Sequence, residues 1–466
     1  MKLAYGVKDK PNAGKLIIFA FQQLLAILAA TIAVPSIIGH GMSQSAALFG
    51  AGVGTIVYLL FTKFRSPVFL GSSFAFIGSM FAAFAGAASN AALGYAGMIL
   101  GAAFAGLVYV VIAIIVKVAG VKWIDKLMPA VVIGPTVSII GLSLAGNAVG
   151  DVLGLADKAE DGSSFIMTTH GWVGFICAMV TLFTVILCSV YGKKMAKLIP
   201  FIIGILAGYA VATCFTLIGK HTGNADLLVI NFDVFQGMKV FEVPEFTFLT
   251  ALDGGFKALD AKFIASIAVA YIPVAFVVFA EHIADHKNLS SVIGSELLED
   301  PGLHRTLLGD GVGSMVGAAF GGCPNTTYGE SVGCVAITGN ASVITIFATA
   351  IMAIAISFFG PFVTFLSTIP ACVMGGVCIT LYGFIAVSGL KMIQKVDLDK
   401  NRNLFVVAVI LISGIGGMTL TFGKVTLTEV ACALILGIIV NLIVPKDKAA
   451  PVHSVQDDDE QTVAVK

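Results

Sequence analysis

Three carboxylates that could bind a ligand lie within stretches of this chain that are otherwise apolar enough to occupy a membrane. One of them, Glu330, follows a proline, an asparagine, two threonines and a glycine within residues 323–338. An acid at that depth costs several kcal/mol unless it has a partner or a function. The Pro, Asn, Thr and Gly residues also disfavour an uninterrupted apolar helix, and they indicate extended backbone that leads into a helix beside a cavity. A broken helix with a buried acid is typical of a transporter binding site.

The other two acids, Glu281 and Asp285, are four residues apart in the apolar stretch 271–286. On a helix they share one face, where they can share a proton, a water or a ligand. His282 and His286 have the same spacing on a face turned by roughly 100° from the acids. We expect these histidines to form an interfacial pair near the cytoplasmic end of the helix. No Lys or Arg within the apolar stretches is available to pair with Glu281.

The carboxylates on two separate spans restrict the charge and the hydrogen-bonding groups of the ligand that can bind. Glu281 and Glu330 present oxygens to N–H groups and would repel an anion, while Phe74 or Tyr328 could stack on a flat ring. The residues therefore favour a planar, neutral ligand that bears N–H groups. Asp310 also lies within a span, but its flanking glycines fit a polar contact between helices at least as well as a role in transport.

The composition places the chain among polytopic membrane proteins. Hydrophobic residues make up 58% and charged residues 12%, the mean hydropathy is +0.99, and the formal net charge is zero. A zero net charge gives no reason to expect a nucleic-acid partner. The eight cysteines show no metal-ligand spacing, and no motif of a common enzyme class is present, so we expect no metal, no cofactor and no enzymatic activity. Without a nucleotide-binding motif, transport would have to be coupled to an ion gradient.

At about 20 residues for each spanning helix, the sequence divides into fourteen apolar segments. We predict an all-α polytopic membrane fold with spans at 15–39, 46–62, 67–87, 91–116, 126–149, 170–190, 197–218, 262–286, 303–321, 323–340, 342–360, 362–389, 403–420 and 425–444.

The segments 67–87 and 323–340 are the least helical in composition, and each is third in its half of seven. Since seven is odd, the second half must run with opposite topology, which predicts an inverted repeat. Residues 70–76 and 325–330 would then face each other near the midplane, with helix N-termini directed at the ligand. The alternative is a pair of glycine-rich packing helices.

The distribution of Lys and Arg predicts the orientation. With the N-terminus inside, 21 of the 27 Lys and Arg residues lie on that side, and only residues 158, 220, 239, 257, 262 and 424 lie outside. Both termini are therefore expected in the cytoplasm, and the polar residues 445–466 are expected to form a disordered tail.

Several long motifs resemble the nucleobase-ascorbate (nucleobase:cation symporter-2) transporters, and among them the bacterial uracil permease branch. The resemblance covers nearly the whole chain. The motifs are residues 22–35, Leu70-Gly-Ser-Ser-Phe-Ala-Phe-Ile77, Ala280-Glu-His282, Asp300-Pro-Gly-Leu-His-Arg305, Pro324-Asn-Thr-Thr-Tyr-Gly-Glu330, Val373-Met-Gly-Gly-Val377 and Leu381-Tyr-Gly383.

The resemblance implies two inverted seven-span repeats in the cytoplasmic membrane, with short strands in spans 3 and 10. It assigns residues 1–117 and 262–360 to a core domain and residues 118–261 and 361–444 to a gate domain, through which the family is expected to dimerise. The substrate-binding residues that it implies are Glu281, Glu330, the main chain at Phe74 and Gly329, Ala30, Tyr328 and, as a gate-side neighbour, Tyr382.

Two positions depart from the uracil-transporting pattern. Asp285 stands where that branch has His, as in xanthine transporters, and Ser331 stands where it has Asn. The xanthine branch typically has Gln at the position of Glu330, so the Glu in this chain argues against a purine substrate. We predict a proton-coupled uracil importer that loads its proton on Glu281 and Asp285, with Na⁺ as an open alternative to H⁺. The rival interpretations are a xanthine or other purine symporter, an anion exchanger or channel of similar architecture, and a membrane-embedded enzyme that uses the acids.

Overall fold

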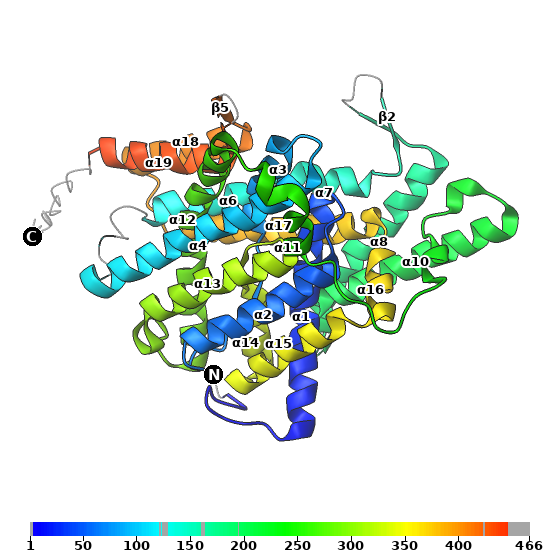
Figure 1. Cartoon of the computed structure of the whole chain (residues 1–466), viewed down its shortest axis with the longest axis horizontal. Helices are drawn as coiled ribbons and strands as arrows, with labels where there is room; N and C mark the ends of the chain where they lie inside the picture. The colour runs from blue at the N-terminus through cyan, green and yellow to red at the C-terminus, as the bar shows by residue number, and fades with distance from the viewer. Residues whose placement is uncertain are drawn as a thin grey trace, which may run out of the picture.

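The computed structural model describes residues 3–120, 123, 129–159, 164–193, 195–422 and 425–445. Within these ranges, eight helical segments are long and apolar enough to cross a membrane (Figure 1). They are α1 (Ala13–Ile38), α2 (Gln44–Phe61), α4 (Ala91–Ala119), α6 (Ala130–Ser143) continued by α7 (Ala145–Val152), α8 (Thr169–Tyr191), α10 (Pro200–Thr222), α12 (Ala261–Ile293) and α17 (Ala371–Ile393). The fold is thus helical and polytopic, as predicted.

The remaining helices are shorter or less apolar. They are α3 (Ile77–Gly86), α9 (Met195–Leu198), α11 (Thr247–Thr250), α13 (Leu303–Gly321), α14 (Gly329–Thr338), α15 (Val343–Ser357), α16 (Gly360–Ser367), α18 (Asn401–Ile415) and α19 (Glu429–Ile443). Each of the fourteen predicted segments contains a helix. Since α14, α15, α18 and α19 have only 10 to 15 residues, however, helix length alone does not give fourteen full spans.

Two predicted boundaries were wrong for identifiable reasons. Helix α12 continues seven residues past the predicted end at residue 286 and stops at Gly294, which caps it in the left-handed conformation with φ 69°. The segment predicted at 362–389 is two helices, because Pro370 ends the connection after α16 and caps the start of α17. The tail predicted from residue 445 lies, beyond Pro445, outside the described residues.

Two short strands pair at the positions that the repeat pattern predicted. Strand β1 (Leu70–Ser72) runs antiparallel to β4 (Asn325–Thr327), with Leu70 opposite Thr327 and Ser72 opposite Asn325. Each strand leads directly into helix, β1 through the 3₁₀ turn η1 (Phe74–Phe76) into α3, and β4 into α14. The hairpins β2–β3 (Asp157–Lys158 with Phe165–Ile166) and β5–β6 (Leu420–Phe422 with Val425–Leu427) were not predicted.

Helices α2 and α13 form a close-packed platform beside the strand pair. A Cβ atom on Gly54 of α2 would lie 2.7 Å from the carbonyl oxygen of Gly313 in α13, and one on Gly50 would collide with the carbonyl oxygen of Gly317. The side chain of Asn325 in β4 donates to the carbonyl oxygen of Gly50 at 3.0 Å. Glycines therefore let the two backbones approach closely enough to hold β4 in place.

Replacing Gly54 with Ala is expected to destabilise the protein by about 1–3 kcal/mol, as overpacking of a tight interface does. The new methyl group would meet backbone on α13 and lie 2.5 Å from Nδ2 of Asn325, neither of which can move freely. Thermal unfolding of the purified protein in detergent measures the effect. Gly146→Ala is the control, since its Cβ would meet nothing within 4 Å. Equal melting temperatures for the two variants would contradict the close contact.

The helices pack in two groups. In one, α2 packs on α13 and α15, α4 packs on α12 and α13, and α1 packs on α15. In the other, α17 packs on α6, α7 and α8, α10 packs on α8, and α18 packs on α6 and α19. Figure 1 shows α18 and α19 together at one edge of the molecule.

Candidate functional site

A cavity of about 490 Å³ lies where the strand pair meets α12 and α17. Helix α12 lines it with Glu281, Ala284, Asp285 and Asn288, whose spacing of three, four and seven residues is that of one helix face. The start of α14 contributes Gly329 and Glu330, and η1 contributes Phe74. The structure therefore brings the three predicted acids to one cavity from two separate helices.

The acids differ in their surroundings. Glu281 and Glu330 are half-buried, whereas Asp285 is buried and its Oδ2 accepts a hydrogen bond of 2.7 Å from the hydroxyl of Thr327 in β4. In the part of the chain that the structure describes, no Lys or Arg forms an ion pair with any of them. Since no cation satisfies these carboxyl groups, they are available to a proton or to a ligand.

Tyr328 lies at the cavity wall, but its hydroxyl is already engaged. It donates to the carbonyl oxygen of Ser72 in β1 at 2.8 Å, and its ring fills the space that a Cβ on Gly71 would need. The side chain therefore holds the strand pair together, and Phe74 is the second predicted aromatic residue that lines the cavity.

Two residues implied by the family resemblance are not among the cavity-lining residues. Ala30 is 1% exposed and belongs to the same apolar cluster as Tyr328. Tyr382 is 2% exposed and packs edge-on against Phe74, with ring centroids 5.9 Å apart. The structure places Ala30 in one cluster with Tyr328 and Tyr382 beside Phe74, and the roles implied for them in substrate binding stay predictions.

Several lining residues were not predicted. Asn288 could have been found from its spacing of seven after Glu281, which places it on the same helix face. Lys197 and Ser388 also line the cavity, from α9 and α17. They come from other helices, and no periodicity in the sequence connects them with the acids.

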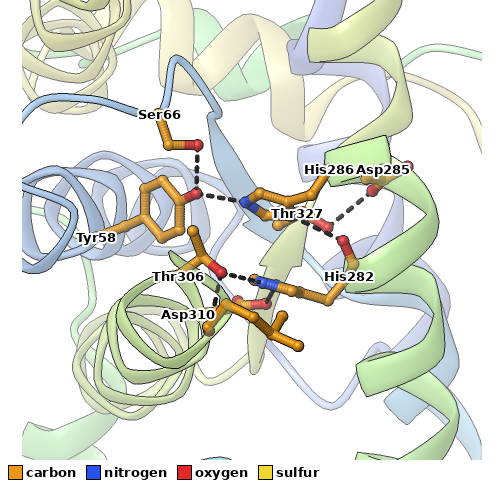
Figure 2. Close-up of polar contacts among 9 residues, drawn as sticks. Tyr58, Ser66, His282, Asp285, His286, Thr306, Asp310 and Thr327 are labelled. Carbon is orange, nitrogen blue, oxygen red and sulfur yellow. Dashed lines mark hydrogen bonds and ion pairs between the residues drawn. The ribbon is translucent and has the colours of Figure 1, made fainter. Parts of the chain in front are cut away.

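The prediction that His282 and His286 form an interfacial pair was wrong. Both are 0% exposed, because α12 extends beyond them and packs them against other helices. Figure 2 shows that His282 contacts Asp310 and that His286 contacts Tyr58. Asp310 is therefore a buried contact between helices, one of the two roles that its sequence allowed.

Ser331, one of the two departures from the uracil-transporting pattern, is fully buried and does not line the cavity. Its Oγ accepts a hydrogen bond of 2.6 Å from Nε2 of Gln23 in α1 and one of 3.3 Å from the amide of Phe69, which precedes β1. Ser331 thereby ties the first turn of α14 to two other elements, and it supports the position of its neighbour Glu330.

The arrangement suits recognition of a small polar molecule. Helix α14 begins at the cavity wall, so its first N–H groups lack partners within the helix. Carboxylate oxygens accept hydrogen bonds, and these amides donate them. A ligand with both N–H and C=O groups on one edge would satisfy both.

Comparisons with known proteins show the family to which the chain belongs. The Xan_ur_permease model, described as Permease family, matches residues 14–423. The uracil permease of Bacillus caldolyticus is 39% identical over 461 residues, which cover 98% of each chain. The uracil permease of Bacillus subtilis (strain 168) is 38% identical over 451 residues and 96% of each chain, and that of Escherichia coli (strain K12) is 33% identical over 444 residues and 94% of each chain.

Solved structures of low sequence identity share the fold. The transmembrane domain of the cyanobacterial bicarbonate transporter BicA aligns with a TM-score of 0.64 at 17% identity, over 92% of this chain and 97% of that one. The murine Solute Carrier 26 family member A9 anion transporter, in its inward-facing state, gives 0.61 at 12% identity, over 93% of this chain and 68% of that one. The family match and the relatives show that the chain is a membrane permease rather than an enzyme. It belongs to the nucleobase-ascorbate, or nucleobase:cation symporter-2, permease family.

Proposed function

We propose that this permease is a proton-coupled symporter that imports uracil across the cytoplasmic membrane. The observation that carries the proposal is the meeting of Glu281 and Glu330 with the start of α14 in one cavity. Uracil is planar and neutral, and N–H and C=O groups alternate along its edge. Its N–H groups match the two carboxylates, its C=O groups match main-chain amides at Phe74 and Gly329, and its ring matches the face of Phe74. The relatives named uracil permeases support this substrate.

The architecture that we propose has fourteen spans in two inverted repeats, divided into core and gate domains at the predicted boundaries. Two observations support it. The strands β1 and β4 occupy equivalent places in the two halves and pair antiparallel. The cavity is lined by α12 from the first packing group, by α14, which packs on α1 and α12, and by α6, α10 and α17 from the second group. Movement of one group against the other would expose the site to alternate sides of the membrane.

The predicted orientation of the spans also gives the side of the membrane to which the cavity opens. Lys197, Asn288 and Met392 line the cavity at helix ends that the Lys and Arg distribution places in the cytoplasm. We infer that this structure faces inward, with both termini in the cytoplasm. Coupling to H⁺ rather than Na⁺, and assembly into a homodimer through the gate domain, complete the proposal.

A purine such as xanthine is the second candidate substrate. The observation that favours it is Asp285, which lines the cavity where the family resemblance implies His in uracil transporters. An anion is a poorer candidate despite the shared fold of the anion transporter, because two carboxylates in one cavity repel negative charge.

Competition for uptake separates the two substrates. Proteoliposomes containing the protein are expected to take up labelled uracil, and a tenfold excess of unlabelled uracil is expected to block this uptake. The same excess of xanthine is expected to leave most of the uptake of labelled uracil unchanged. Uptake that xanthine blocks and unlabelled uracil does not would contradict the assignment to uracil. Empty liposomes and liposomes with the Glu281→Gln variant are the controls.

A further inference from the structure

Helix α12 has two polar faces, and the transport chemistry proposed above uses only one of them. Glu281, Asp285 and Asn288 face the cavity. His282 and His286 lie on a face turned by roughly 100°, and both are fully buried against α2 and α13. Buried imidazoles in a membrane protein are costly unless each polar atom has a partner, so their contacts indicate a role.

The two histidines connect α12 to both neighbouring helices (Figure 2). Nδ1 of His282 lies 2.7 Å from Oδ2 of Asp310, and its Nε2 lies 2.9 Å from Oγ1 of Thr306, both in α13. Nε2 of His286 lies 2.7 Å from the hydroxyl of Tyr58 in α2. The two rings stack on each other with centroids 4.0 Å apart.

The acceptors in this cluster fix how the rings are oriented. Thr306 donates its hydroxyl hydrogen to the carbonyl oxygen of Leu303, so Nε2 of His282 must be the donor in its contact with Thr306. Nδ1 of His286 lies 2.7 Å from the carbonyl oxygen of His282 and must also be a donor. Neither ring can be flipped without losing a hydrogen bond.

The partners of the histidines are themselves held rigidly. Tyr58 lies on α2 and Asp310 on α13, the two helices that form the close-packed glycine platform. A Cβ on Gly309, next to Asp310, would lie 3.0 Å from the ring of Tyr58 and 3.1 Å from its carbonyl oxygen. The hydroxyl of Tyr58 also lies 2.7 Å from Oγ of Ser66. The imidazoles therefore attach α12 to a fixed frame.

We propose that His282 and His286 are positioning residues that fix the rotation of α12 about its axis and so direct Glu281 and Asp285 into the cavity. The inference rests on the proposed function, because it gives the histidines a purpose in nucleobase binding. The histidines touch no part of the cavity, so they act through the acids. A misplacement of about 1 Å is enough to cost on the order of 100-fold in a site that depends on geometry.

A double-mutant cycle tests whether the histidines act through Glu281. His286→Leu removes the contact with Tyr58 and is expected to raise the Kd for uracil about tenfold. His286→Gln keeps a polar atom near the place of Nε2 and is expected to restore most of the affinity. In the Glu281→Gln background, His286→Leu is expected to add little, because the group that it positions is already lost. If the fold increases in Kd of the two single variants multiply in the double variant, the role of His286 is purely structural and the proposal is overturned.

Tyr58→Phe provides a second route to the same test, should His286→Leu fail to fold. It removes only the hydroxyl that meets His286 and keeps the ring that packs on Gly309. Like His286→Leu, it is expected to raise the Kd for uracil. In the Glu281→Gln background it is expected to raise the Kd little further. Unchanged affinity in this variant would contradict the proposal.

Thiol labelling tests the rotation of α12 without any ligand. Asn288 is exposed and lies near the centre of the cavity-facing stripe, so rotation in either direction turns it away. Asn288→Cys introduces a thiol at this position, and a Cys334→Ser background removes a native cavity cysteine. The thiol is labelled with a water-soluble maleimide. We expect it to react more slowly when Tyr58→Phe is added. An unchanged rate would contradict the proposal. If the unsubstituted protein binds neither uracil nor xanthine, the proposed function fails while this measurement still decides the positioning role.

Discussion

Replacing Glu330 with Gln is expected to raise the Kd for uracil by about ten- to a hundredfold, since a hydrogen bond to a charged group contributes about 1.5–3 kcal/mol. Glutamine keeps the size of the side chain, but it loses the negative charge and replaces one acceptor oxygen with an N–H donor. Isothermal titration of the purified protein with uracil measures the effect. Glu299→Gln is the matched control, because it removes an exposed carboxylate that does not line the cavity.

The same variant also tests selectivity. The family resemblance implies Gln at this position in xanthine transporters, so Glu330→Gln is expected to improve binding of xanthine relative to uracil. A variant that binds uracil with unchanged affinity would show that Glu330 does not contact the base.

Asp285→Asn is expected to separate binding from coupling. Asparagine retains an oxygen that can accept the hydrogen bond from Thr327, but it cannot take up and release a proton. We expect the Kd for uracil to stay within about threefold of the native value, which is less than 1 kcal/mol. Accumulation of uracil driven by an imposed pH gradient is expected to be lost.

Two transport assays distinguish these effects of Asp285→Asn. Exchange of labelled for unlabelled uracil across the membrane needs only binding and conformational change, and it is expected to continue. Uphill accumulation needs the coupled proton and is expected to stop. Accumulation that persists at the native rate would place the coupling proton elsewhere, while loss of both activities would show that Asp285 is needed for binding or folding.

The sequence predicted those features that depend on local pattern. The recurrence of polar, glycine-containing stretches at corresponding places in the two halves predicted that residues 70–76 and 325–330 would face each other, and β1 and β4 pair there. The helical period predicted that Glu281 and Asp285 would share a face, and both line the cavity. These predictions succeeded because spacing along the chain determines them.

The features that the sequence did not predict depend on packing between distant segments. His282 and His286 lie near Lys287, which indicates an interface, yet they are buried because Tyr58 and Asp310 approach from other helices. The family resemblance implied Ala30 and Tyr382 as site residues, whereas other residues line the cavity in this structure, and the role of these two in binding stays a prediction. The hydroxyl of Tyr328 could not be assigned to Ser72 before the register of the strands was known.

Uracil-dependent proton uptake tests the central claim most directly. Proteoliposomes with a trapped pH indicator are expected to acidify inside when uracil is added, and the Glu281→Gln and Glu330→Gln variants are expected to lose this response. Acidification in both variants, together with native uracil binding, would contradict the assignment of these two carboxylates to the substrate site.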